Sequence, residues 1–488
     1  LALLSTFGPE TGQHLPMPGT TSPLDALRQR LPAHLQALEH GLLERETAAR
    51  LLLLAALAGE HVLLIGPPGT AKSALARRLH RAFGGARYFE RLLTRFSTPE
   101  ELFGPLSLKA LEDDRYERLV DGYLPTAGIA FLDEVFKANS AILNALLTLL
   151  NERAFDNGAQ RLAVPLVSVV GASNERPADE SLQAFFDRFL LRVPVAPVGD
   201  AAFGALLQLD DAAGPALPDP ITAGERAALQ LAAAGVVLDG ATLAAFTALR
   251  AEAARLGLAV SDRRWRQLVA LLRCAAAAEG RATLDPLDLW LAPVVIGDSD
   301  DSQAALAAWV TSTLAQAEPQ PLPWLDHAVT AFEKQLEIEQ RLPADEGGSA
   351  DDDAGKLALA RSLGAQDGGE ANGGMQRILS ARLEDKLRRH FSPVHVAARL
   401  AQVDAIARRA GDATAAVQAQ HDALAQRLAH RLWLPPALAE GWLGAHRQTL
   451  AKLAGLSERL AATRAGFAAH PVDEALPAVA PAPVALAA

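Results

Sequence analysis

The chain has 488 residues, of which 50% are hydrophobic and 21% are charged, and its formal net charge is −11. This length allows several domains, each with its own core, and the acidic balance gives the molecule as a whole no attraction for nucleic acid or acidic lipid. A single cysteine, Cys274, excludes an internal disulfide framework and a CxxC metal or redox site. We expect Cys274 to be a small buried side chain on a helix.

Residues 1–22 are rich in Gly, Pro and Thr, and we expect them to form a flexible N-terminus. They do not resemble a secretory signal, because they lack basic residues and a long apolar segment. No window approaches the roughly 18 uninterrupted apolar residues of a membrane span, so we expect no transmembrane segment and a cytoplasmic location. The first residue is Leu1 and the first methionine is Met17, which leaves the true start of the chain open.

Residues 23–200 alternate between helical patterns and short apolar runs, which predicts a parallel α/β sheet covered by helices on both faces. The predicted strands are 61–65, 129–134 and 166–174, and the predicted helices are two between Pro23 and Leu57, then 73–83, 139–152 and 181–192. Two hairpins should project between these elements. The first spans 115–125 around an Asp-Gly turn, and the second spans 153–165 around Asn-Gly.

The rest of the chain is helical in pattern. Residues 201–300 predict a compact all-α domain, and residues 301–342 with 376–468 predict a second helical domain of long paired helices. Residues 343–375 are acidic and glycine-rich, which is typical of a linker that cannot bury enough surface to order itself. Residues 469–488 are rich in Pro and Ala and predict a tail.

A glycine-rich stretch follows the first predicted strand and precedes a helix. It consists of Gly66, Pro67, Pro68, Gly69, Thr70, Ala71, Lys72 and Ser73. This arrangement directs backbone N–H groups and a helix N-terminus at one point, where Lys72 meets the β- and γ-phosphates of a nucleotide and Ser73 binds Mg²⁺. Ala71 replaces the usual last glycine, and its methyl group costs little if the backbone there keeps an ordinary conformation.

Two acidic residues end the strand predicted at 129–134. Asp133 would orient Mg²⁺ together with Ser73, and Glu134 would polarise the attacking water. An apolar run followed by two acids is common at strand ends, where the acids are only solvated. Following a phosphate loop and preceding a helix, the pair becomes a specific signal.

Three further polar side chains complete the predicted site. Asn174 ends the next strand and could hydrogen-bond the water and the γ-phosphate. An arginine after it, Arg188 or alternatively Arg192, lies in an apolar segment and could reach a neighbouring subunit as an arginine finger. In the helical domain, Ser261 should cap a helix whose first turn holds Arg263 and Arg264, either of which could contact phosphate.

In this order, these residues resemble the Walker A, Walker B, sensor 1, arginine-finger and sensor 2 elements of AAA+ ATPases. The stretches FSTPEELFGPLSLKAL, FLDEVFKANSAILNALLTLLNER and GASNERP are similar to the MoxR branch, and SDRRW resembles its RavA group. The likeness covers about residues 24–300. It implies an AAA+ P-loop core, an all-α lid, a C-terminal helical bundle, and ATP and Mg²⁺ as ligands. In this branch alanine is usual in the Walker A motif, and the two hairpins correspond to the helix-2 insert and the pre-sensor-1 hairpin.

The leading hypothesis is an ATP hydrolase that forms a homo-hexameric ring and remodels protein clients. The resemblance adds a partner with a von Willebrand factor A (vWA) domain, whereas the short acidic interruption gives no ground for a lysine decarboxylase partner. A DNA motor is a second hypothesis, opposed by the nearly neutral tip FDNGAQR. A third is a nucleotide-gated scaffold with little turnover, opposed by the intact Lys72, Asp133 and Glu134.

Overall fold

The computed structural model describes residues 22–177, 179, 182–209, 217–341 and 389–486. The predicted linker at 343–375 and nearly all of the predicted flexible N-terminus lie outside these residues. The chain divides into two compact units: one comprises Leu1–Gln316 with His430–Ala439, and the other comprises Ala317–Ala429 with Glu440–Ala488. The helix Asp300–Trp309 therefore belongs with the first unit, although the sequence placed residues 301–342 with the C-terminal helices.

A five-stranded parallel sheet forms the centre of the first unit, as predicted. Its strands, in spatial order, are β2 (Tyr88–Leu92), β3 (Ile129–Asp133), β6 (Ser168–Ser173), β1 (Val62–Ile65) and β7 (Leu191–Pro194). The predicted helix 181–192 is wrong. Of the described residues in this segment, the helical ones end at Phe186 with α7 (Gln183–Phe186). The chain then pairs with β1: the amides of Leu190 and Leu191 donate to the carbonyl of His61, and Pro194 cannot continue a helix.

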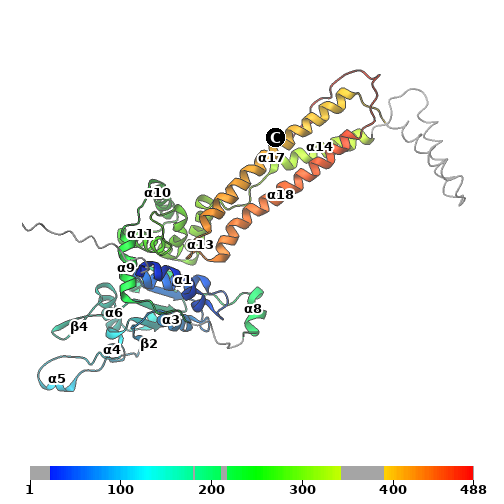
Figure 1. Cartoon of the computed structure of the whole chain (residues 1–488). Coiled ribbons are helices and arrows are strands. Elements are labelled where there is room, and N and C mark those ends of the chain that lie inside the picture. Colours follow the sequence, from blue (N-terminus) through cyan, green and yellow to red (C-terminus); the bar gives the residue numbers. More distant parts are fainter. Residues whose placement is uncertain (1–21, 178, 180–181, 210–216, 342–388, 487–488) are drawn as a thin grey trace, which may run out of the picture. The chain divides into compact units, whose positions relative to one another are not determined.

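Helices cover both faces of the sheet (Figure 1). These are α1 (Pro23–Glu39), α2 (Glu46–Ala58), α3 (Lys72–Arg81), α4 (Pro99–Phe103) and α6 (Ser140–Glu152). Successive residues of β1 point to opposite faces: Val62 and Leu64 pack with α1, α2 and α3, whereas Leu63 and Ile65 pack with α4 and α6. All four residues of β1 are buried, as expected for a central strand of a doubly covered parallel sheet.

Two insertions project from this core (Figure 1). The predicted hairpin at 153–165 is present as β4 (Ala154–Asn157) and β5 (Gln160–Ala163). The hairpin predicted at 115–125 is absent: the extended half pairs with the segment before α5 (Leu108–Glu112) through a bridge between Leu106 and Arg118. The side chain of Asn157 hydrogen-bonds both the backbone N–H and the carbonyl of Arg118, with N–O distances of 2.7 and 3.1 Å. After Asp121, residues Leu124–Thr126 form a short 3₁₀ helix.

The predicted all-α domain is present. Its helices are α9 (Ala223–Ala234), α10 (Gly240–Arg255), α11 (Asp262–Ala278), a 3₁₀ segment (Pro286–Leu291), α12 (Ala292–Ile296), α13 (Asp300–Trp309) and a π-helical turn (Val310–Leu314). The helix α8 (Asp200–Leu207) lies apart from them and has no buried residue (Figure 1). Ser261 caps α11 by accepting the Arg264 amide, as predicted. Cys274 lies on this helix, and burial raises the pKa of its thiol to about 12.

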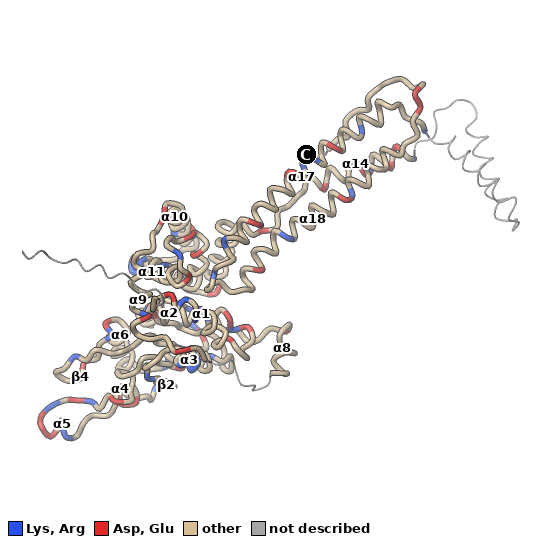
Figure 2. The backbone as a smooth tube through the Cα atoms, in the orientation of Figure 1, with Lys and Arg blue, Asp and Glu red and all other residues tan. Residues whose placement is uncertain are grey.

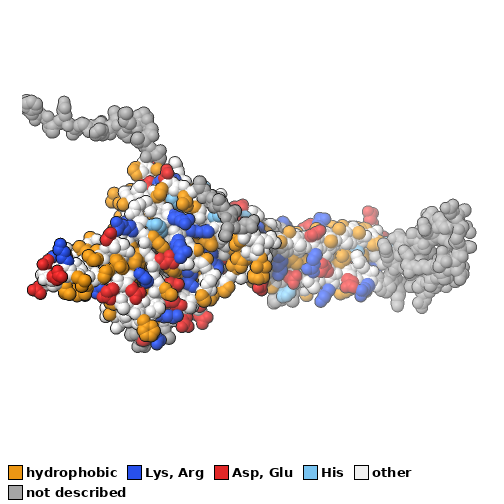
Figure 3. Space-filling model, turned by 90° about the horizontal axis from the view of Figure 1, so that it is seen from below, with side chains coloured by type: hydrophobic (Ala, Val, Ile, Leu, Met, Phe, Trp, Pro, Cys, Tyr) orange, Lys and Arg blue, Asp and Glu red, His pale blue; other side chains and the backbone are white. Residues whose placement is uncertain are grey.

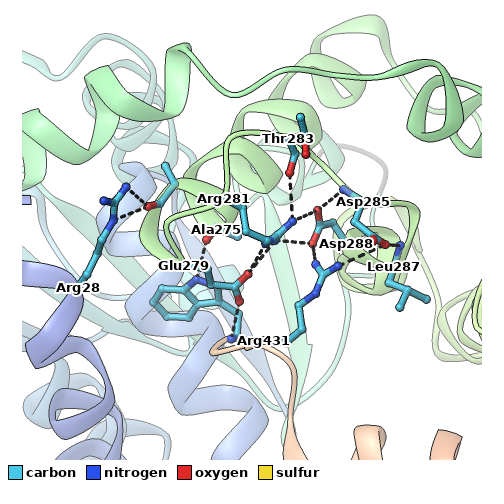
Figure 4. A network of polar contacts seen from close by, with 11 residues as sticks. Arg28, Ala275, Glu279, Arg281, Thr283, Asp285, Leu287, Asp288 and Arg431 are labelled. Carbon is cyan, nitrogen blue, oxygen red and sulfur yellow. Dashed lines mark hydrogen bonds and ion pairs between the residues drawn. The ribbon is translucent and has the colours of Figure 1, made fainter. Parts of the chain in front are cut away.

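The segment His430–Ala439 joins the first unit from far along the chain. The guanidinium of Arg431 contacts the carboxylates of Asp285 and Asp288, and the indole N–H of Trp433 donates to the Ala275 carbonyl over 3.2 Å (Figure 4). Asp288 also pairs with Arg281, at 2.7 Å, so each buried charge has a partner. This network ties the segment to the all-α domain.

The second unit is a bundle of long helices, α14 (Pro323–Arg341), α17 (Pro393–Leu428) and α18 (Pro436–Ala468). α17 and α18 run in opposite directions, as predicted, and pack with α14 through one apolar cluster (Figure 1). Part of the predicted tail returns to this bundle: Arg399 donates to the Ala482 carbonyl at 2.8 Å. Among the described helices, none has the length and apolar character to cross a membrane.

Candidate functional site

The phosphate loop leaves the carboxyl end of β1 and enters α3. Gly66 is buried against the core, and a Cβ there would lie 2.0 Å from the Val195 carbonyl oxygen, so only glycine fits. Gly69 has φ +82°, which also suits glycine. Pro67 and Pro68 are exposed, while the hydroxyl of Thr70 closes the loop by donating to the Pro67 carbonyl at 2.9 Å. The backbone is thus shaped as a cradle.

Ala71 departs from the sequence expectation. Its φ of 66° and ψ of 20° lie in the left-handed region, which costs an alanine roughly 1 kcal/mol more than a glycine. The methyl group is therefore not cost-free, because the turn into α3 imposes this conformation. The strain lies directly before Lys72.

Lys72 is buried, and its ammonium donates to the carbonyls of Gly66 and Pro67 at 2.6 and 2.8 Å. Burial lowers the pKa of Lys72, and the nearby charges of Asp133 and Glu134 oppose this shift. The ammonium thus lies within the loop, close to both acids. Ser73 follows it in the first turn of α3.

Asp133 and Glu134 stand at the carboxyl end of β3, and Asn174 stands at the end of β6, which lies between β3 and β1. The amide of Asn174 donates to Glu134 Oε1 at 2.7 Å, and Asp133 accepts the Glu134 backbone N–H at 3.0 Å. Three adjacent strands therefore bring the loop, the two acids and the amide to one edge. The set suits Mg²⁺ bound to phosphate, because it offers a hydroxyl and a carboxylate beside an anion cradle.

The two candidate finger arginines differ in their surroundings. Arg192 is 2% exposed, donates to the Asp187 carboxylate at 2.6 Å and lies 3.9 Å from the centre of the Phe186 ring. Arg188 is partly exposed, and its guanidinium makes no hydrogen bond or ion pair to another described residue. Arg192 is therefore engaged within its own chain, which leaves Arg188 as the candidate to contact another molecule.

The two candidate lid arginines differ in the same way. Arg264 is buried and donates to the carbonyls of Leu190 and Val295, at 3.2 and 2.6 Å, so it joins the lid to the start of β7. Arg263 is exposed, and its guanidinium donates a hydrogen bond to the side-chain oxygen of Asn151 on α6, at 3.3 Å. Arg264 is a structural clamp, and Arg263 is the one with its guanidinium toward solvent.

Arg188 and Arg263 lie together, but not beside Lys72. Burial, followed by repulsion from Arg263, lowers the pKa of Arg188. Both lie near the amino end of β1. Arg188 is two residues before Leu190, whose amide donates to the carbonyl of His61, and the charge of Arg263 acts on Glu60. The four residues of β1 separate this edge from the phosphate loop by about 13 Å. The expected contact of Arg263 with the phosphate of its own chain does not fit this placement.

Comparison with known proteins shows the family of the chain. A family model of the MoxR domain in MoxR-vWA-beta-propeller ternary systems matches residues 29–216, and a model of the AAA lid domain matches residues 242–310. Protein MoxR of Paracoccus denitrificans is 30% identical, over 53% of this chain and 85% of that protein. The chain belongs to the MoxR family of AAA+ ATPases.

Two uncharacterized proteins of Methanocaldococcus jannaschii are also similar to this MoxR-family chain. They are 41% and 42% identical, over 53% and 51% of this chain and 68% and 66% of their own lengths. A solved structure from Cytophaga hutchinsonii has a TM-score of 0.47 and 16% identity, over 58% of this chain and 91% of that one, and it is too distant to add to the assignment.

Sequence reasoning missed two residues of this MoxR-type site. Lys137 lies 3.1 Å from Glu134 Oε1, one turn further along the chain. Arg45 is buried in front of α2 and donates to the carbonyls of Thr70 and Ala196, at 3.1 and 2.6 Å, so it braces the phosphate loop. The spacing of three residues could have suggested Lys137, but nothing in the sequence around Arg45 indicated a contact 25 residues away.

Proposed function

We propose that this MoxR-family protein binds ATP with Mg²⁺ at the carboxyl edge of its sheet and hydrolyses it within a ring of identical subunits, a hexamer. One observation carries the proposal. Lys72, Ser73, Asp133, Glu134 and Asn174 lie at one edge, while Arg188 and Arg263 lie at the other. A phosphate-binding site and its arginines that are separated within one chain can meet only between two chains.

The residues of the carboxyl edge would bind Mg²⁺, bind the phosphates and position the attacking water. Ser73 and Asp133 would hold Mg²⁺, which offsets charge on the phosphate oxygens when bound. The ammonium of Lys72 would leave the loop carbonyls for the phosphates, since these carry the greater charge. Glu134 would orient the attacking water and accept its proton, and Asn174, already bonded to Glu134, would hold both in place.

The arginines of the amino edge would act on the neighbour. Arg188 is partly exposed, as an arginine finger must be to contact another subunit, and Arg263 lies beside it. Both would therefore stabilise charge on the neighbour's phosphates. Burial of Arg188 and its repulsion from Arg263 are only partly offset by Asp187, and an incoming triphosphate would offset the remaining cost. This placement supports a ring rather than an isolated subunit.

Protein partners follow from the family that the chain matches. The matched MoxR domain is described in systems that also contain vWA and β-propeller components, so we propose a vWA-domain protein as the partner and protein remodelling of a chaperone-like kind as the output. Within the family, SDRRW supports a place near the RavA group.

A mixing experiment tests the ring. Glu134→Gln disables a subunit's own site, and Arg188→Ala disables the site of its neighbour. Each variant alone should lose at least about 100-fold in phosphate release, and a mixture should recover activity, because intact sites form where the two kinds of subunit meet. Particle mass with ATP and Mg²⁺ should correspond to a hexamer. A monomer with full turnover, or a mixture as inactive as its components, would sink the proposal.

Two alternatives are decided by the same material. A scaffold with little turnover is favoured by the resting contacts of Glu134, whose carboxylate is held by both Asn174 and Lys137. It predicts that the wild type releases phosphate no faster than Glu134→Gln while binding nucleotide. A DNA motor is opposed by the insertions, where acidic and basic residues alternate around α5 (Figure 2), and by the mixed charges on the face in Figure 3.

A further inference from the structure

A cavity of about 660 Å³ opens at the amino edge of the sheet, away from the phosphate loop. Its walls are the turns that lead into β2, β3 and β6, the end of α2 at Gly59, and the start of α9. Close backbone approaches fix these walls: a Cβ on Gly128 would lie 2.6 Å from the Ala86 side chain, and Ile221 donates to the Ala82 carbonyl at 2.7 Å. The volume is in the range of small-molecule sites.

Three arginines line this cavity, and its described lining contains no Asp or Glu. They are Arg87, Arg153 and Arg226. Arg87 pairs with the exposed carboxylate of Asp121. Arg153 donates to carbonyls, among them those of Gly59 and Leu166, and the acid whose charge acts on it is Glu60.

Of the three cavity arginines, Arg226 has the fewest contacts to its guanidinium. Its guanidinium makes no hydrogen bond or ion pair to another described residue, and its Nη1 is buried without a partner. Burial, followed by the charge of Arg153, lowers the pKa of Arg226. Leaving a guanidinium half-buried beside a like charge is costly unless an anion offsets it.

We propose that this cavity binds a small multivalent oxyanion, a molecule with two or more phosphate or carboxylate groups, between Arg226 and Arg153. Guanidinium forks match both kinds of group in bidentate geometry. The site differs from the nucleotide site, because ligands of parallel sheets bind at the carboxyl edge and this cavity lies at the amino edge. Arg226 belongs to α9 and Arg153 follows α6, so the anion would join the lid to the core.

Pyrophosphate and citrate serve as probes, titrated calorimetrically into the full chain at constant ionic strength. The protein carries Lys72→Ala so that the phosphate loop does not compete for the probe. The test variant adds Arg226→Gln, chosen because this side chain holds no backbone group. The matched control adds Arg250→Gln, which removes an equal charge from α10 of the same domain, outside the cavity lining.

At least one probe should bind, and Arg226→Gln should weaken that binding by about tenfold or more, with the Arg250→Gln control unchanged. The probe should also raise the melting temperature of the Lys72→Ala protein, and less so when Arg226 is replaced. The proposal is overturned if neither probe binds, or if binding is equally weakened in both arginine variants. No ATP is present, so the outcome is independent of the proposed hydrolysis.

Discussion

The two edges of the parallel sheet obtain their side chains in different ways. At the carboxyl edge, Asp133 ends β3, Asn174 follows β6, and Lys72 lies on the loop and helix that leave β1, so the strand order brings the three together. At the amino edge, Glu60, Arg153, Arg188 and Arg263 come from four separate segments, one of them in the lid. The first edge is encoded locally and repeats a known motif. The second exists only because the lid packs against the core, so its chemistry depends on tertiary structure.

The largest effect is expected from removing the ammonium of Lys72 at the carboxyl edge. Lys72→Ala should reduce ATP turnover by at least about 1,000-fold, roughly 4 kcal/mol, because the loop loses the cation that meets the phosphates. Nucleotide affinity should fall with it, as measured by calorimetry with Mg²⁺. Lys109→Ala, on the exposed α5, is the control and should change neither quantity. Normal turnover in Lys72→Ala would remove the motif from the mechanism.

The amino edge is tested by separating its structural arginine from its exposed one. Arg264→Ala should lower the free energy of unfolding of the first unit by about 3 kcal/mol, because it leaves the buried carbonyls of Leu190 and Val295 unpaired. Arg263→Ala should leave stability within about 0.5 kcal/mol and instead reduce turnover. Calorimetric melting and phosphate release measure the two effects. If Arg263→Ala destabilises as much as Arg264→Ala, the two roles are not separate.

Local signals predicted the carboxyl edge and much of the fold. The sheet, the β4–β5 hairpin and the Ser261 cap each depend on a few neighbouring residues, and the structure contains all three. The errors came from segments whose partners are distant. The segment 181–192 has a helical pattern, but its last residues pair with β1 as part of β7. The Asp-Gly turn at 121–122 does not form a hairpin, and the backbone groups of Arg118 are hydrogen-bonded to the side chain of Asn157 instead.

The position of Arg263 could not be predicted for a similar reason. Its spacing from Ser261 defines the first turn of α11, but only the packing of the lid decides which edge of the sheet that turn faces. The cavity could not be predicted from the sequence, since Arg87, Arg153 and Arg226 are far apart along the chain and line one cavity only in the folded structure.

Glu60 gives a smaller test of burial at the amino edge. Burial, opposed by Arg153 and Arg263, raises the pKa of Glu60 from 4.5 to about 7. Between these values the folded protein keeps a proton that the unfolded chain has released, so this residue's contribution to stability is present below about pH 4.5 and is lost as the pH rises through about 7. Glu60→Gln keeps an acceptor for Gln267 and does not titrate.

Relative to the wild type, the Glu60→Gln variant should therefore gain about 2 kcal/mol in unfolding free energy between pH 5 and pH 8. Melting temperatures of both proteins across that range measure the difference. Glu252→Gln on α10 is the control, because the hydrogen bond from Arg255 lowers the pKa of Glu252, and its offset from the wild type should stay nearly constant over the same interval. A constant offset for Glu60→Gln would mean that Glu60 is solvated and that this edge is not a buried electrostatic site.

The smallest expected effect returns to the carboxyl edge. Ala71 has φ 66°, so Ala71→Gly should stabilise the protein by about 1 kcal/mol or less, because glycine adopts the left-handed region without strain. Ala74→Gly, inside α3, is the matched control and should destabilise by a similar amount, since its backbone is right-handed and helical. Opposite signs in the two melting temperatures would show that strain is stored before Lys72. Equal losses would mean that the loop favours alanine for a reason other than its backbone conformation.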